Sequence, residues 1–178
     1  MSAQLSAIHI YPIKSIAPID LSIAYVQRDG LAFDRRFVLS DSSGRFITAR
    51  LMPKLVLVRA ALVPDGLILS APGMPDFALR YTDIGEARRP LTIWRDTLQA
   101  RHCHAAADAW FSRYLDRPVQ LLFQDAQTRR ATQLGDATVS FADGYPLLLA
   151  TDASLTEVSR RSREPIAKRR VTALPLNP

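Results

Sequence analysis

The sequence has almost no cysteine and no long hydrophobic run. Its single cysteine, Cys103, cannot form an internal disulfide, and one thiol is too few for a structural zinc site. The apolar run at residues 147–150 is far shorter than the roughly 20 residues that a membrane helix needs. The first ten residues lack the basic start and apolar centre of a secretory signal. We therefore expect a cytoplasmic protein that does not span a membrane.

Familiar catalytic signatures are also missing. The sequence contains no paired-cysteine motif, Walker loop, dinucleotide-binding glycine pattern or Gly-x-Ser-x-Gly elbow. His102, Cys103 and His104 are consecutive, but adjacent side chains point to different sides of an extended chain and rarely meet on one ion. His9 lies in an alternating, strand-like stretch and is expected to be structural. The sequence therefore predicts no metal site and no catalytic residue.

The charge of the chain is positive. The 178 residues include 23 lysines and arginines against 17 acidic residues, a formal net charge of +6. With 48% hydrophobic and 22% charged residues, the composition is that of a folded globular protein. A positive field favours an anionic ligand or partner. Nucleic acid is not expected, because aromatic and basic residues are not interleaved as in single-strand platforms.

Short β-type segments separated by turn residues dominate up to about residue 101. The alternation of Leu21, Ile23 and Tyr25 with other residues predicts one strand. Turn residues at 41–44 and 64–66 predict hairpins, because Asp and Gly favour tight turns. The strand pairs expected on this basis are 37–39 with 46–48, 55–62 with 67–69, and 91–94 with 97–101. An antiparallel sandwich or closed β-barrel follows from this spacing.

The later part of the chain adds helical signals. Apolar residues at helical spacing predict a helix over 106–115, followed by a strand at 119–123 and a polar loop at 128–137. A strand-like run ends at residue 150, and Thr151 or Ser154 can cap a second helix, with Glu157 completing a capping box. The expected fold is mainly β (α+β), with one or two peripheral helices.

Four segments place basic and polar residues directly after strands. Lys14 and Ser15 could capture an oxyanion, and Arg35 and Arg50 could hold a phosphate in a bidentate manner. In the alternative reading, Asp34 only pairs with a neighbouring arginine at the surface. The segments are Tyr-Pro-Ile-Lys-Ser at 11–15, Gly-Leu-Ala-Phe-Asp-Arg-Arg at 30–36, Phe-Ile-Thr-Ala-Arg at 46–50 and Ser-Phe-Ala-Asp-Gly-Tyr-Pro at 140–146.

In this order, the four segments resemble the N-terminal half of the YcbX and amidoxime-reducing component family of MOSC proteins, over residues 8–159. The resemblance implies an N-terminal MOSC β-barrel domain at 1–125 and a linker with the incomplete start of a MOSC domain at 126–178. It also implies the molybdenum cofactor (molybdopterin), reduction of N-hydroxylated compounds and a ferredoxin-like electron donor. The implied cofactor-binding residues are Lys14, Ser15, Arg35, Asp143, Gly144 and Tyr145.

The sequence departs from the family near Arg170. The family's Phe-Arg-Pro-Asn motif and molybdenum-ligating cysteine are missing, and Cys103 falls in the wrong domain to replace that cysteine. We therefore expect a truncated form without the metal ligand, and whether the chain is an enzyme stays open. The alternative is a noncatalytic β-barrel module that binds an anionic ligand or a protein partner. A homodimer that covers the surface of a half-built second domain is also expected.

Overall fold

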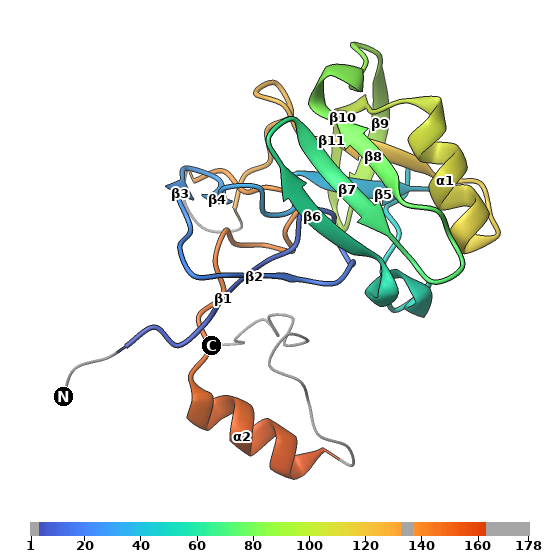
Figure 1. Ribbon diagram of the computed structural model, residues 1–178. Coiled ribbons are helices and arrows are strands. Elements are labelled where there is room, and N and C mark those ends of the chain that lie inside the picture. The colour runs from blue at the N-terminus through green and yellow to red at the C-terminus, as the bar shows by residue number, and fades with distance from the viewer. Residues whose placement is uncertain (1–3, 133–136, 163–178) are drawn as a thin grey trace.

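The computed structural model describes residues 4–132 and 137–162, and in these strands predominate (Figure 1). The named strand pairs are all antiparallel and belong to four small sheets. This arrangement confirms the mainly β fold with two α-helices. The elements are β1 (Ile8–Ile10), β2 (Ile19–Leu21), β3 (Val26–Gln27), β4 (Gly30–Leu31), β5 (Phe37–Ser40), η1 (Pro53–Leu57), β6 (Arg59–Val63), β7 (Gly66–Ser70), β8 (Phe77–Arg80), η2 (Tyr81–Asp83), β9 (Arg88–Ile93), β10 (Asp96–His102), α1 (Ala105–Leu115), β11 (Gln120–Phe123) and α2 (Asp152–Arg161).

The centre of the fold is β5, a strand that is buried on both faces. It lies at one end of the sheet ordered β5-β11-β10-β9. Because side chains alternate along a strand, Phe37 and Leu39 enter a large core that includes Phe111 of α1. Val38 faces the other way and enters a second, smaller core with Phe141. Residues just before β5 are therefore held in place from two sides.

Two predicted hairpins are confirmed. β6 and β7 pair from Arg59 to Ser70, and β9 and β10 pair across a tight turn. Gly66 is required at the first of these turns, since a Cβ there would come within 2.0 Å of the Leu79 carbonyl oxygen. The α1 helix and the β11 strand are also close to their predicted positions.

The turn at 41–44 forms as predicted, although its second arm does not become a full strand. Asp41 Oδ1 accepts hydrogen bonds from the backbone nitrogens of Ser43 at 2.9 Å and Arg45 at 3.0 Å. Gly44 completes the turn with a φ of +82°. Beyond it, Phe46 forms an isolated bridge to Ser40, and its backbone nitrogen donates to the Thr92 carbonyl at 3.1 Å. The chain then leaves the sheet and carries Arg50 toward the site described below.

Three further predicted strand segments are wrong. The alternation at 21–25 does not produce one strand: β2 ends at Leu21, where its pairing with β1 ends, and Ile23 and Tyr25 are exposed. Residues 55–57 form the end of the 3-10 helix η1, which begins at Pro53 because proline suits the first turn of a helix. Residues 147–150 are irregular, and their leucines are largely exposed.

The second predicted helix is present as α2, set apart from the sheets in Figure 1. Thr151 is its N-cap, because the side-chain oxygen accepts a hydrogen bond from the Ser154 backbone nitrogen at 3.1 Å. Ser154 is therefore not the cap, and Glu157 does not complete a capping box. Glu157 instead forms ion pairs with Arg160 and Arg161.

Two parts of the predictions fall outside the described residues. These are residues 133–136 of the expected loop and residues 163–178, which include Arg170, where the family resemblance stops. The division of the chain at residue 125 stays a prediction. Within the described ranges, no helix combines the length and the apolar character that a bilayer crossing requires.

Candidate functional site

The first two motifs are joined by backbone hydrogen bonds between the loop after β1 and the approach to β5. The Lys14 backbone nitrogen donates to the Phe37 carbonyl at 2.8 Å, and the Arg35 backbone nitrogen donates to the Tyr11 carbonyl at 2.7 Å. Asp34 is only 3% exposed, and its Oδ1 accepts a bond from the Tyr11 backbone nitrogen at 2.8 Å. Burying a carboxylate is costly unless it is paired, so Asp34 fixes this junction.

The fourth motif packs along the second. The Phe141 backbone nitrogen donates to the Arg35 carbonyl at 3.0 Å, and the Ser140 nitrogen donates to the Asp29 carbonyl at 3.3 Å. Close packing continues at Gly30, where a Cβ would lie 3.0 Å from the Pro146 carbonyl oxygen. The folded chain thus brings the turn at 143–145 to the loop that carries Lys14 and Arg35.

Lys14 and Asp143 meet directly at the centre of this region. Lys14 Nζ donates to Asp143 Oδ1 at 2.6 Å, and the Lys14 side chain is 8% exposed. The Trp94 indole nitrogen donates to the same oxygen at 3.2 Å. We call Lys14, Arg35, Trp94, Arg130 and Asp143 the Lys14 cluster. The cluster contains one carboxylate and three cationic side chains, and Asp34 and Asp96 outside the cluster form ion pairs with two of these cations.

The electrostatics of the cluster follow from burial. Burial lowers the pKa of Lys14 to about 8, with Asp143 opposing the shift and Arg35 and Arg130 adding to it. Burial alone would raise the pKa of Asp143, but Lys14 and the hydrogen bonds from Lys14 and Trp94 hold that pKa below its usual value. The ammonium is therefore poorly solvated, and an incoming anion would stabilise its charged form.

Arg35 and Asp34 form an ion pair at the edge of the cluster. The Arg35 guanidinium lies 4.6 Å from the centre of the Tyr11 ring, and its Nη1 bonds Asp34 Oδ2. The alternative reading of this motif was correct about the ion pair. It was wrong about the location, because Asp34 is buried and burial raises the pKa of its carboxyl group. The pair is thus part of the interior that positions Arg35.

Arg130 is a member of the cluster that the sequence analysis missed. It is 5% exposed and donates to Asp96 Oδ2 at 2.6 Å and to the Asp143 carbonyl at 2.7 Å. It also bonds the carbonyls of Ser140 and Ala142. These bonds fix the turn that presents the Asp143 side chain. Arg130 belongs to a polar loop in the sequence, and no local pattern distinguishes it from its neighbours.

Backbone strain is concentrated around the cluster. Five non-glycine residues in the described ranges have a positive φ. The residue outside this region is Asp116, which ends α1. The other four are Ser15 at 75°, Phe33 at 67°, Arg35 at 47° and Trp94 at 54°. Each such conformation costs about 1–3 kcal/mol and tends to occur at functional sites.

The predicted site residues lie at different depths in this region. Lys14, Arg35 and Asp143 come together, and Ser15 follows Lys14 as a partly buried residue. Gly144 is also partly buried, whereas Tyr145 is 47% exposed in the same turn. Arg50 is exposed and reaches the cluster only through the Trp94 ring, 5.0 Å from its guanidinium carbon. Cofactor binding by these residues stays a prediction.

The donors of the cluster suit anionic oxygens. Ammonium, guanidinium and indole N–H groups bind phosphate well, and they fit the phosphate-bearing part of a pterin cofactor. They do not fit a metal ion, and the described residues contain no group of three or more His, Cys, Asp or Glu placed to hold one. The donors of the cluster therefore suit the phosphate of a pterin cofactor and do not suit its metal.

Cys103 and its two histidine neighbours have separate surroundings. Cys103 is buried in the large core, and burial raises the pKa of its thiol. His102 Nε2 lies 2.6 Å from Asp108 Oδ2, while the His104 ring packs beside Phe77. The three adjacent side chains do not converge on a common point.

Comparison with known proteins supports the same family. The family model described as the MOSC N-terminal beta barrel domain matches residues 2–118. Mitochondrial amidoxime-reducing component 1 of Mus musculus is 30% identical over 184 residues, which cover 95% of this chain and 52% of the mouse protein. Molybdenum cofactor sulfurase 1 of Aedes aegypti is 29% identical over 160 residues, 85% of this chain and 21% of the insect protein.

The extent of these matches differs. The chain spans about half the length of the amidoxime-reducing components it matches, and a smaller share of the sulfurase. A solution structure of a protein of Bordetella bronchiseptica aligns with a TM-score of 0.47 and 20% identity, covering 62% of this chain and 95% of that one. The family model alone covers well over half of the 178 residues, and its range contains Lys14 and Arg35. This chain therefore belongs to the MOSC N-terminal beta barrel domain family.

Proposed function

We propose that this chain binds the molybdenum cofactor (molybdopterin) through its phosphate, and that it is related in function to reductases of N-hydroxylated compounds. The observation that carries the proposal is the buried Lys14 ammonium, which faces Asp143 and lies near two further cations. The names of the relatives, molybdenum cofactor sulfurase and amidoxime-reducing component, support the identity of the ligand.

Each residue has a role that follows from its chemistry. Lys14 and Arg35 would neutralise the phosphate, and the Ser15 hydroxyl would donate a hydrogen bond to it. Asp143 is an acceptor that suits the N–H groups of a pterin, with Gly144 and Tyr145 beside it. When bound, the cofactor supplies redox chemistry through its metal. The residues of this chain hold the anionic end of the cofactor and restrict its contact with water.

The partners belong to the proposal as well. Reduction requires electrons, so a ferredoxin-like domain or protein would deliver them to the bound cofactor. A homodimer remains a second proposal for the exposed apolar residues, which include Ile23, Tyr25 and Leu149. Sizing in solution tests it: a dimer that Leu149→Glu converts to a monomer supports it, and a wild-type monomer refutes it.

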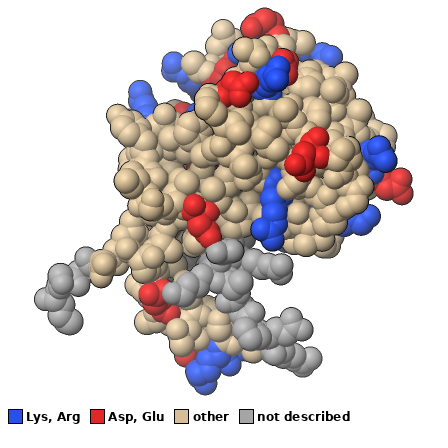
Figure 2. Space-filling view, viewed as in Figure 1, with Lys and Arg blue, Asp and Glu red and all other residues tan. Residues whose placement is uncertain are grey.

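An alternative function is a noncatalytic module that binds another anionic ligand or a protein partner. The exposed apolar side chains include neighbours in the chain at 25–26 and 147–149, and contiguous exposed apolar surface favours a protein partner. Nucleic acid is not favoured. In Figure 2 acidic and basic side chains are interspersed over the visible face and form no continuous basic stripe.

Production in a host that makes the cofactor tests the proposal. The 178-residue chain is purified, and its pterin and molybdenum contents are measured. We expect bound pterin in the wild type and at least a tenfold loss in Lys14→Gln and Arg35→Gln, with thermal unfolding to confirm folding. Arg160→Gln is the matched control, because Arg160 is exposed and pairs only with Glu157 among the described residues.

The outcomes separate the alternatives. Equal pterin contents in the wild type and the two cluster variants, or no pterin in any of them, would refute the proposal. A wild type without pterin that still binds inorganic phosphate would favour the noncatalytic module. Molybdenum recovered in proportion to the pterin would support the proposal, because the cofactor itself carries the metal and the cluster would hold only its phosphate.

A further inference from the structure

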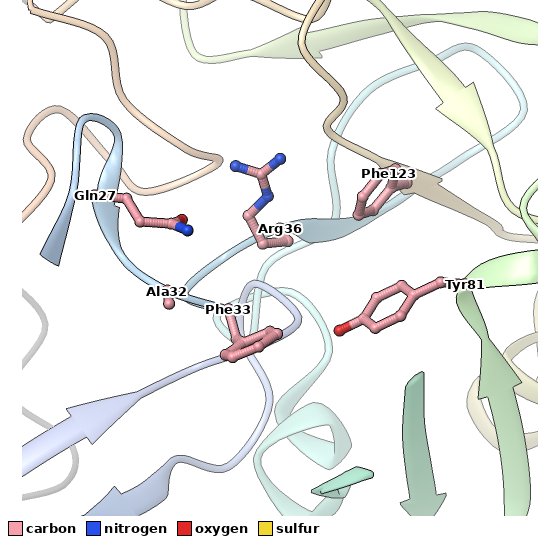
Figure 3. A pocket seen from close by; sticks show the side chains of 6 residues that line it. All are labelled: Gln27, Ala32, Phe33, Arg36, Tyr81 and Phe123. Atoms are coloured by element: carbon pink, nitrogen blue, oxygen red, sulfur yellow. The ribbon is translucent and has the colours of Figure 1, made fainter. Parts of the chain in front are cut away.

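A hollow separate from the Lys14 cluster lies between the β3–β4 hairpin and the aromatic side chains beside β5. It is an open depression of about 220 Å³, lined by Gln27, Ala32, Phe33, Arg36, Tyr81 and Phe123. In Figure 3 the Tyr81 hydroxyl points toward the Phe33 ring, and the Arg36 guanidinium lies above them. Pockets for drug-sized ligands have volumes of about 300–1,000 Å³, so this hollow suits a smaller molecule with a single ring.

Phe33 forms one wall in an unfavourable conformation. The backbone of Phe33 has a φ of 67°, and 46% of the residue remains exposed. A bulky residue rarely adopts this conformation, and an exposed ring gains little burial in return. Hydrogen bonds hold the backbone on both sides, from the Ala32 nitrogen to Tyr25 and from the Asp34 nitrogen to Leu31. The ring is thus kept at the hollow by the backbone around it.

The opposite wall is rigid. Tyr81 stacks on Phe37 with ring centres 6.4 Å apart, and it lies 6.5 Å from Phe123. Phe123 in turn packs 4.9 Å from Phe37, which is fully buried in the large core. Aromatic pairs at these separations attract a further ring that stacks or meets them edge-on. A flat ligand would therefore enter a site whose walls are already in place.

Arg36 supplies the polar end of the hollow. Its Nη2 donates to the Gln124 carbonyl at 2.7 Å, and its guanidinium carbon lies 5.7 Å from the centre of the Phe123 ring. Its Nη1 is 3.8 Å from Asp29 Oδ2, longer than a hydrogen bond. Burial lowers the pKa of Arg36, opposed by the charges of Asp29, Tyr81 and Asp125. A ligand carboxylate would solvate this guanidinium better than Asp29 does.

We propose that this hollow binds a planar aromatic carboxylate, with its ring between Phe33 and Tyr81 and its carboxylate on Arg36. The planar shape follows from the three aromatic side chains, and the negative charge follows from the partly buried guanidinium. Asp29 is the one carboxylate within ion-pair distance of Arg36 in the described ranges, and it competes with the ligand. The site is distinct from the anion site around Lys14.

Benzoate is a suitable probe, and its binding can be followed by chemical-shift changes in the 15N-labelled full chain. We expect saturable shifts centred on residues 27–36, 81 and 123. Cyclohexanecarboxylate has the same charge without a flat ring, and benzyl alcohol has the ring without the charge. Both should bind at least threefold more weakly than benzoate if ring and charge are recognised together.

Four variants give the proposal a specific signature. Phe33→Gly removes the ring at a position where glycine relieves strain, so the protein should fold while benzoate affinity falls about fivefold. Arg36→Gln should reduce affinity about tenfold. Asp29→Asn removes the competing charge and can still accept the bond from Thr138, so affinity should rise at least twofold. Lys14→Gln should leave benzoate binding unchanged.

The contrary results are equally specific. Benzoate shifts centred on the Lys14 cluster, or an affinity that Phe33→Gly leaves intact, would overturn the proposal. Equal affinity for cyclohexanecarboxylate would remove the argument for an aromatic ligand. Weaker binding in Asp29→Asn would contradict the role assigned to Arg36. Since Lys14→Gln is measured in the same series, failure of this site is distinguishable from failure of the cofactor proposal.

Discussion

Two regions of the molecule contain groups of reactive or charged side chains, and they differ in whether these residues are neighbours in the sequence or in space. The segment of His102, Cys103 and His104 is contiguous in sequence, yet each side chain has its own partner or core position. The Lys14 cluster draws residues from four distant segments onto one carboxylate, Asp143, and its neighbours. Within the described ranges, positive φ angles occur at Arg35 and Trp94 of the cluster and at none of the three residues 102–104. Convergence in space, rather than adjacency in sequence, is the reason for proposing the Lys14 cluster as the functional site.

The largest expected effect comes from Asp34, which holds the cluster together. Asp34→Ala leaves the Arg35 guanidinium and the Tyr11 backbone nitrogen without their buried acceptor, so we expect a loss of about 3 kcal/mol of stability. Urea unfolding measures it. Glu86→Ala is the matched control, because the Glu86 side chain is 93% exposed and pairs with Arg101 at the surface, so its cost should stay below about 0.5 kcal/mol. Equal costs would show that the cluster is no more tightly built than the surface.

The second-largest expected effect is a pH dependence of the free energy of unfolding that comes from Lys14. Lys14 has a pKa of about 8 in the folded protein and 10.5 as its ordinary value, so between these pH values the unfolded chain binds more protons. Stability attributable to Lys14 should therefore rise with pH from 8 to 10.5, by at most about 3 kcal/mol. Urea unfolding of the wild type relative to Lys14→Met measures this. A difference that stays constant or falls over that interval would contradict the buried ammonium.

Cys103 provides the reverse test. Cys103→Ser places a hydroxyl in the large core, and we expect a loss of about 2 kcal/mol in stability. Phosphate binding, measured by calorimetry, should not change, because the thiol lies outside the Lys14 cluster. In the wild-type chain, the Cys103 thiol should react slowly with a disulfide reagent, because burial raises the pKa of the thiol. A clear loss of phosphate affinity would mean that the two regions are coupled.

The smallest effect concerns backbone strain. Ser15→Gly should raise stability by up to about 1 kcal/mol, because glycine adopts a φ of 75° without a steric cost. It should weaken phosphate binding, since the Ser15 hydroxyl is lost. Asp116→Gly is the matched control at φ 54° and should stabilise the protein without changing phosphate affinity. If both variants bind phosphate equally well, Ser15 has no role in the site.

The sequence predicted local features better than distant contacts. The hairpins at β6–β7 and β9–β10 were predictable because turn residues and alternating side chains lie next to each other in the chain. The strand at 21–25 was not, because β2 loses its partner after Leu21 and alternation alone cannot supply one. A strand needs both a pattern and a neighbour, and only the pattern is visible locally.

The site was predictable in part for the same reason. Lys14, Arg35 and Asp143 belong to motifs that a family resemblance singled out, so their meeting was expected. Arg130 has no such motif, and its role depends on carbonyls of residues 140–143 that only the fold brings to it. Trp94 likewise contacts Asp143, from the turn that follows β9. Side chains that hold a turn in place carry no local pattern.

We propose that the Lys14 ammonium is the group through which the Lys14 cluster binds phosphate. NMR of the side chain, with 15N labelling of Nζ, can follow its titration with and without inorganic phosphate. We expect a Lys14 pKa of about 8 that rises when phosphate is added, because a bound anion stabilises the charged amine. A Lys14 titration that phosphate leaves unchanged would contradict the claim.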